Sequence, residues 1–207
     1  MRPQLNIPTM LTLGRMALIP LFVVIFFLGD WGRPVSAILF LLAGLTDWLD
    51  GYLARRLNQT SHFGAFLDPV ADKLIVAVAL VLIVYAHDGL FGPVVALSSA
   101  IIIGREIGVS AIREWMALLG ARQRVAVVAI GKIKTIVQVI ALFILLYRRP
   151  IYGLEIYEYG VLLLFFAAAL TLWSMFVYLR AAWPVIVDPN AEIPPERGAD
   201  DERDGGA

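Results

Sequence analysis

The sequence contains no cysteine and only two histidines among 207 residues. The absence of cysteine excludes a disulfide scaffold, thiolate metal sites and cysteine catalysis. Two histidines leave little room for a histidine-rich zinc site. Any chemistry that this chain performs must therefore come from other side chains.

Charged residues are also scarce, at 16% of the chain, whereas hydrophobic residues make up 60% and the mean hydropathy is +0.80. A soluble domain carries about 25% charged and about 45–50% apolar residues. A water-soluble globule of this size could not bury so much apolar surface, which excludes an ordinary cytosolic enzyme. We expect a membrane protein without a nucleic-acid partner.

Six apolar stretches approach the roughly 20 residues that a membrane-spanning helix needs. They run approximately over Met10–Leu28, Pro34–Arg55, Pro69–Tyr85, Phe91–Trp115, Val125–Tyr147 and Tyr157–Ala181. The sequence thus predicts an all-α, polytopic membrane domain of six transmembrane helices over residues 1–183. Residues 184–207 hold seven acidic and two basic residues and are rich in proline and glycine, which predicts a disordered acidic tail.

Basic residues predict the orientation of these spans. If the N-terminus is inside, the outer ends before the tail carry only Arg33, Arg148 and Arg149, and all other basic residues fall at the inner ends. The positive-inside rule then places both termini in the cytoplasm.

Four aspartates stand where the second and third spans meet. Asp47 and Asp50 are three residues apart and Asp68 and Asp72 are four apart, so each pair shares one helix face. The connector of residues 56–64 lets the two helices run antiparallel, which brings the four carboxylates together at the inner ends.

Close carboxylates repel each other unless a cation lies among them. Oxygen ligands without histidine or cysteine favour Mg²⁺, with Mn²⁺ as the alternative, and a pair of such ions can assist phosphoryl transfer. Gly51, Ala54 and Gly64 permit close approach of helices or of a bulky ligand. Arg55, one turn after Gly51, is well placed for a pyrophosphate.

Two other interpretations of the aspartates compete with a metal site. One is an interfacial salt-bridge network with Arg55, Arg56 and Lys73. The other is a cation transporter. Transporters usually hold such charges near the bilayer midplane on paired repeats, whereas here the carboxylates gather at one end of one helix pair and no internal repeat is present.

The residues from Asp47 to Asp72 resemble the complete signature of the CDP-alcohol phosphatidyltransferases, with every position matched. The resemblance implies six helices around a cytoplasm-facing polar cavity, two divalent cations and a homodimer. It also implies a metal-dependent transferase that converts CDP-diacylglycerol and an alcohol into a phospholipid and CMP. By the same resemblance Asp72 is both a metal ligand and the general base, beside the ligands Asp47, Asp50 and Asp68. The residues implied to hold the CDP-diacylglycerol are Gly51, Ala54, Arg55, Ser61 and Gly64.

A second group of charges predicts where the acceptor alcohol binds. Arg105 and Arg113 are eight residues apart and share a helix face, and Lys132 and Lys134 stand at the inner end of the fifth span. Together they suit an acceptor that carries a phosphate better than serine or choline. Orientation alone, or contact with anionic lipid headgroups, would also place bases here, and Glu106 would then neutralise one of them.

Further segments resemble the bacterial members of the family whose acceptor is sn-glycerol 3-phosphate. These segments are residues 6–15, 105–116, 131–135 and 171–174. The resemblance implies phosphatidylglycerophosphate as the product and a place in the bacterial inner membrane, with the active site on the cytoplasmic side. Another acceptor, such as inositol phosphate or serine, remains the alternative.

Overall fold

The computed structural model describes residues 7–57, 62–118, 130–150 and 153–187. Within these ranges the side chains of residues 7–9, 11, 47–57, 62–66, 68, 130–133, 181 and 184–186 are not described.

The described ranges form α-helices and one short 3₁₀ turn, with no extended strand ladder. The elements are α1 (Ile7–Phe26), η1 (Gly29–Trp31), α2 (Gly32–Leu57), α3 (His62–Ala86), α4 (Gly92–Leu118), α5 (Ile130–Tyr147) and α6 (Tyr157–Val187). The predicted all-α fold is confirmed.

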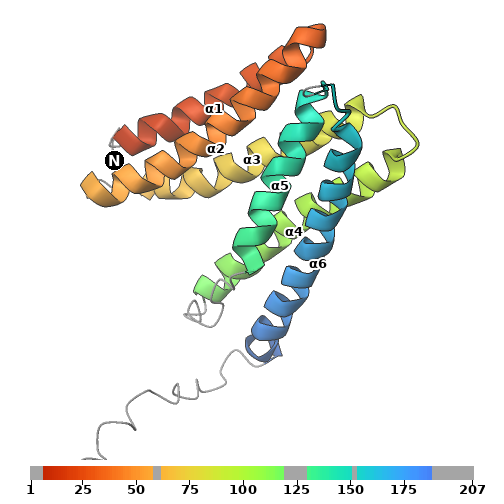
Figure 1. The fold of residues 1–207 in the computed structure, drawn as a ribbon. Helices are drawn as coiled ribbons and strands as arrows, with labels where there is room; N and C mark the ends of the chain where they lie inside the picture. The colour runs from red at the N-terminus through yellow and green to blue at the C-terminus, as the bar shows by residue number, and fades with distance from the viewer. Residues whose placement is uncertain (1–6, 58–61, 119–129, 151–152, 188–207) are drawn as a thin grey trace, which may run out of the picture.

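The helices pack as two groups that share contacts (Figure 1). Helix α1 packs against α2 and α3, and α6 packs against α4 and α5, while α2 contacts α5 and α3 contacts α4. Figure 1 shows the start of α1, the end of α2 and the start of α3 together, and the end of α4 close to the start of α5. These are helix ends that the sequence assigns to the cytoplasm. Within each of the two groups they lie close to one another (Figure 1).

The core combines small and large apolar side chains. Ala37, Ala79 and Ala141 are completely buried, as are Leu80 and Leu142. Small residues let helix backbones approach closely, and the leucines fill the space that remains.

Large apolar side chains also cover the outside of the bundle. Phe165 and Phe166 are each 51% exposed, and Trp173 and Phe176 are exposed above 60%. Because a water-exposed surface of this kind would favour aggregation, it is suited to hydrocarbon.

By length and composition, three described helical stretches are able to cross a membrane: Pro69–Ala86, Gly92–Leu118 and Tyr157–Arg180. Two shorter apolar stretches cover Thr12–Phe26 and Lys134–Tyr147. The membrane character is confirmed, and the count of six spans stays a prediction.

Helix ends differ most from the sequence prediction at the start of α3 and at the end of α6. Helix α3 begins at His62 and passes through Pro69, where the third span was expected to begin. Helix α6 continues to Val187, beyond the expected end at Ala181. A proline within a membrane helix is tolerated where neighbouring groups satisfy the freed backbone carbonyl, so Pro69 does not mark a boundary.

The predicted outer end is held together around Arg148. Its guanidinium donates to the carbonyl oxygen of Ala86, lies 3.5 Å from Asp88 and stands over the ring of Tyr157 at 5.3 Å. The Tyr157 hydroxyl is 2.7 Å from Nδ1 of His87. These contacts tie the α3–α4 connection to the α5–α6 connection, beyond the end of α3 and away from Asp72 in its first half.

Candidate active site

The predicted general base, Asp72, is paired with a buried arginine. Arg15 of α1 donates from Nη1 to Oδ1 of Asp72 on α3, at 2.5 Å. The Arg15 side chain is 1% exposed, while that of Asp72 is 44% exposed. A buried guanidinium of this kind needs an anionic partner, and the partly exposed side chain of Asp72 is accessible to a ligand.

Sequence reasoning used Arg15 as one of the inner bases that set orientation and did not predict this pair. The available signal was a cation inside an otherwise apolar helix, which is costly unless it is paired. The identity of its partner depends on how α1 packs against α3.

The predicted metal ligands come from the end of one helix and the start of the next. Asp47 and Asp50 lie in the last turns of α2, and Asp68 and Asp72 lie in the first half of α3. Helices α2 and α3 contact each other. A donor set made of carboxylates alone suits a hard divalent cation, so the residues present fit the implied metals.

Most predicted donor-site side chains fall outside the described ones. This applies to Asp47, Asp50, Gly51, Ala54, Arg55, Gly64 and Asp68, and Ser61 lies outside the described residues altogether. Among the side chains that are described, no three acidic or histidine residues gather as a metal site. The metal and nucleotide assignments therefore stay predictions.

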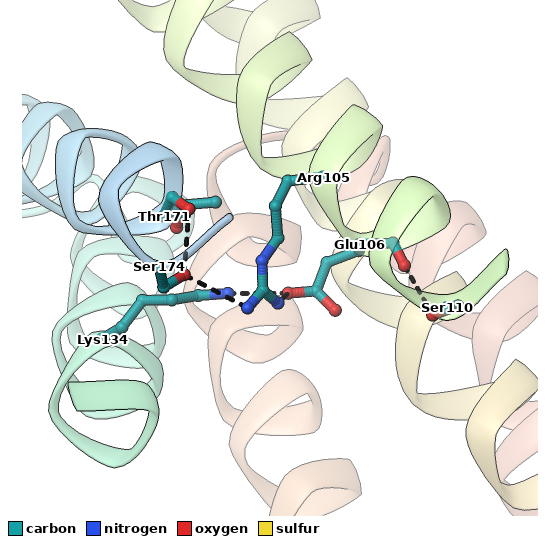
Figure 2. A network of polar contacts seen from close by, with 6 residues as sticks. All are labelled: Arg105, Glu106, Ser110, Lys134, Thr171 and Ser174. Atoms are coloured by element: carbon teal, nitrogen blue, oxygen red, sulfur yellow. Dashed lines mark hydrogen bonds and ion pairs between the residues drawn. The ribbon is translucent and has the colours of Figure 1, made fainter. Parts of the chain in front are cut away.

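A second polar cluster joins α4 to α5 (Figure 2). Oε1 of Glu106 accepts a hydrogen bond from Nη1 of Arg105 at 2.9 Å and another from Nζ of Lys134 at 2.8 Å. Lys134 is 4% exposed, Arg105 14% and Glu106 27%. Two of the four predicted acceptor-site cations thus converge on one carboxylate, which neutralises part of their charge.

Helix α6 completes this cluster. Ser174 accepts a hydrogen bond from Nη2 of Arg105 at 3.2 Å and donates one to the backbone oxygen of Thr171 at 2.9 Å. Ser110 donates to the backbone oxygen of Glu106, one turn earlier on α4. Figure 2 shows the side chains of α4, α5 and α6 meeting at the guanidinium, so three helices fix the position of Arg105.

The cluster retains capacity for an anion. Two cations and one carboxylate leave one positive charge in excess. Nε of Arg105 is buried and has no hydrogen-bond partner within the described part of the chain. A guanidinium with a spare donor beside an ammonium group suits a phosphate.

The other two predicted acceptor residues are not placed in this cluster. The side chain of Arg113 is exposed, and it forms no ion pair or hydrogen bond with the described residues. The side chain of Lys132 is not among those described. Eight residues of α4 separate Arg113 from Arg105 by about 12 Å along the helix axis and by about 80° around it, so this spacing does not bring their charged groups to one point.

An apolar cavity of about 280 Å³ adjoins Glu106. It is formed by α3 and α4 and is lined by residues that include Val70, Lys73, Leu74, Ile103, Glu106 and Ile107. Its apolar walls suit hydrocarbon. Lys73 and Glu106 are the charged residues in its lining.

Comparison with known proteins gives a consistent result. A family model described as CDP-alcohol phosphatidyltransferase matches residues 5–173. The CDP-diacylglycerol--glycerol-3-phosphate 3-phosphatidyltransferase of Salmonella typhimurium (strain LT2) is 54% identical over 187 residues, which are 89% of this chain and 99% of the relative. Proteins of the same name from Pectobacterium atrosepticum and Yersinia pestis (strain Pestoides F) are 52% and 51% identical, over 90% of this chain and 100% of each relative.

Proposed function

Because the chain belongs to the CDP-alcohol phosphatidyltransferase family, we propose that it transfers the phosphatidyl group of CDP-diacylglycerol to sn-glycerol 3-phosphate. The products are phosphatidylglycerophosphate and CMP. The observation that carries the choice of acceptor is the convergence of Arg105 and Lys134 on one point between three helices. The names of the relatives agree with a phosphorylated acceptor.

Members of this family generally depend on divalent cations. In the proposed site Asp47, Asp50, Asp68 and Asp72 would hold two of them, Mg²⁺ or alternatively Mn²⁺. When bound, such cations neutralise charge on the diphosphate and on the departing CMP. Gly51, Ala54, Arg55, Ser61 and Gly64 are the residues proposed to hold the cytidine diphosphate.

Asp72 takes the proton from the acceptor hydroxyl in this proposal. The hydroxyl oxygen then forms a bond to the phosphorus that carries the diacylglycerol, and the bond from that phosphorus to the CMP oxygen breaks. Arg15, which donates to one oxygen of the Asp72 carboxylate at 2.5 Å, fixes the orientation of the side chain that takes the proton. A base oriented in this way contributes to the rate through position as well as through basicity.

The acceptor phosphate binds at Arg105 and Lys134 in this proposal, and Arg113 and Lys132 stay proposed contributors to its binding. A phosphate gains charge-assisted hydrogen bonds from each cation that reaches it. An acceptor without a phosphate, such as serine, leaves these cations without a ligand.

The chain is a multi-pass membrane protein with bacterial relatives. We propose that it lies in the inner membrane, with both termini and the active site facing the cytoplasm, where the charged substrates are. The implied homodimer likewise stays a prediction.

The test is an assay of CMP release by the purified protein with CDP-diacylglycerol and Mg²⁺. We expect release with sn-glycerol 3-phosphate and none with glycerol, serine or inositol phosphate. Excess chelator should abolish release, and added Mg²⁺ or Mn²⁺ should restore it. Release with serine or inositol phosphate alone would assign a different acceptor, and no release with any acceptor and either metal would contradict the proposed activity.

A further inference from the structure

We propose that Glu106 is a positioning residue that holds Arg105 and Lys134 in the arrangement in which they receive the acceptor phosphate. This inference rests on the function proposed above and assigns a role to a residue that the reaction does not otherwise use.

The geometry of the carboxylate is the first argument. A single oxygen of Glu106 accepts from Nη1 of Arg105 and from Nζ of Lys134. Arg105 and Lys134 come from different helices, and without an anion between them their charges repel. Glu106 therefore keeps two like charges side by side, as a phosphate ligand requires.

The burial of the cations is the second argument. Lys134 is 4% exposed and Arg105 is 14% exposed, and removal of one partner from a buried ion pair is strongly unfavourable. A lysine left in this position would turn towards water or lose its proton. Either change removes one of the two cations from the proposed phosphate site.

The remaining donors are the third argument. Arg105 uses Nη1 for Glu106 and Nη2 for Ser174, while its buried Nε has no partner in the described ranges. The ammonium group of Lys134 has three protons and, among the residues that the structure describes, makes one hydrogen bond, to Glu106. A phosphate can therefore accept hydrogen bonds from Arg105 and Lys134 without displacing Glu106.

The opposite role for Glu106 would be that of a competitor, which occupies the phosphate site and must leave it. The two roles predict opposite changes in the acceptor KM when the carboxylate is removed. Loss of a positioning carboxylate weakens acceptor binding, whereas loss of a competing carboxylate strengthens it.

The experiment compares steady-state constants of the full-length protein and its Glu106→Gln variant, which keeps size and shape but loses the charge. We expect the KM for sn-glycerol 3-phosphate to rise about tenfold or more, equivalent to about 1.4 kcal/mol of binding. We expect kcat and the KM for CDP-diacylglycerol to change less than about threefold. Arg105→Ala should show the same selective rise in the acceptor KM.

Two further variants complete the set. Glu106→Asp keeps the charge with a shorter reach and should raise the acceptor KM less than Glu106→Gln does. Glu114→Gln removes an exposed carboxylate from the same helix and should leave all constants unchanged, which controls for the general loss of negative charge.

A fall in the acceptor KM, equal rises in both KM values, or a loss confined to kcat would overturn the positioning role. If Glu106→Gln does not give folded protein, Glu106→Asp decides: a rise in the acceptor KM alone supports the role, and unchanged constants overturn it. If the unmodified protein releases no CMP with sn-glycerol 3-phosphate, the proposed function itself fails before any variant is compared.

Discussion

At the scale of single residues, the two polar clusters follow one rule. A cation stands in an apolar helix, and it forms an ion pair with a carboxylate from the same helix or from a neighbouring one. Arg15 meets Asp72 across α1 and α3, and Arg105 and Lys134 meet Glu106. Because charges at membrane depth are costly without partners, each cluster also fixes how its helices are placed.

Asp72→Asn tests the proposed base. We expect CMP release to fall to at most a few percent of the unmodified rate, since an amide cannot accept the proton. The variant should remain folded and bind CDP-diacylglycerol, because the other three proposed metal ligands are unchanged. CMP release and lipid-dependent thermal stabilisation in detergent measure the two properties.

The matched control is Asp88→Asn at the opposite end of the bundle. Asp88 is 83% exposed and lies 3.5 Å from Arg148, and an exposed pair of this kind contributes little to stability. Its rate should match that of the unmodified protein. Substantial CMP release by Asp72→Asn would remove Asp72 from the role of base.

The sequence allowed part of these clusters to be predicted. The spacing of the aspartates and the inner position of Arg105 and Lys134 follow from helical periodicity and local composition. The partner of Arg15 is 57 residues away and is determined by packing that no local pattern encodes. For Glu106 the sequence suggested one neutralised base, and the structure shows two.

At the scale of elements, apolar runs predicted that six helices exist, and their ends were predicted less well. One reason is visible at α3, where Pro69, the expected start of the third span, lies inside the helix. Pro20 likewise lies inside α1, as the predicted first span allowed. In water a proline often marks the end of a helix. In a membrane, backbone groups without a hydrogen bond are costly, so the helix continues past the proline.

The junction of α1 and α2 depends on a glycine at the first residue of α2. A Cβ atom added to Gly32 would collide with the backbone oxygen of Ile25. Since backbone atoms cannot move aside as a side chain can, we expect Gly32→Ala to destabilise the protein by about 2 kcal/mol or more. The change in stability is measured by heating the protein in detergent and monitoring the loss of monodisperse protein.

Gly44→Ala provides the comparison within the same helix. No atom outside its local backbone lies within 4 Å of the added Cβ, and alanine is favoured over glycine in a helix by up to about 1 kcal/mol. Its stability should be equal to or above that of the unmodified protein. Equal effects of the two substitutions would show that close approach at Gly32 is unimportant.

At the scale of the whole molecule, the fold separates two chemically different ends. One holds the proposed catalytic residues and most of the basic side chains. The other holds Arg33, Arg148 and Arg149, which line a hollow of about 520 Å³ with Asp30, Asp88 and Tyr147. A chain with exposed aromatic side chains between two polar ends is suited to a bilayer, and the excess of basic residues predicts which end faces the cytoplasm.

This orientation can be tested cleanly because the chain has no cysteine, so an introduced thiol is unique. Leu90 precedes α4 and is 90% exposed, and Leu118 ends α4 and is 82% exposed. The 27 residues of α4 extend about 40 Å as a helix, enough to cross a hydrocarbon core of about 30 Å.

A membrane-impermeant maleimide should label Leu90→Cys in intact spheroplasts and Leu118→Cys only after lysis. CMP release by both variants would confirm that they are folded. The reverse pattern would place the catalytic end outside, and labelling of both from one side would mean that α4 does not span the membrane.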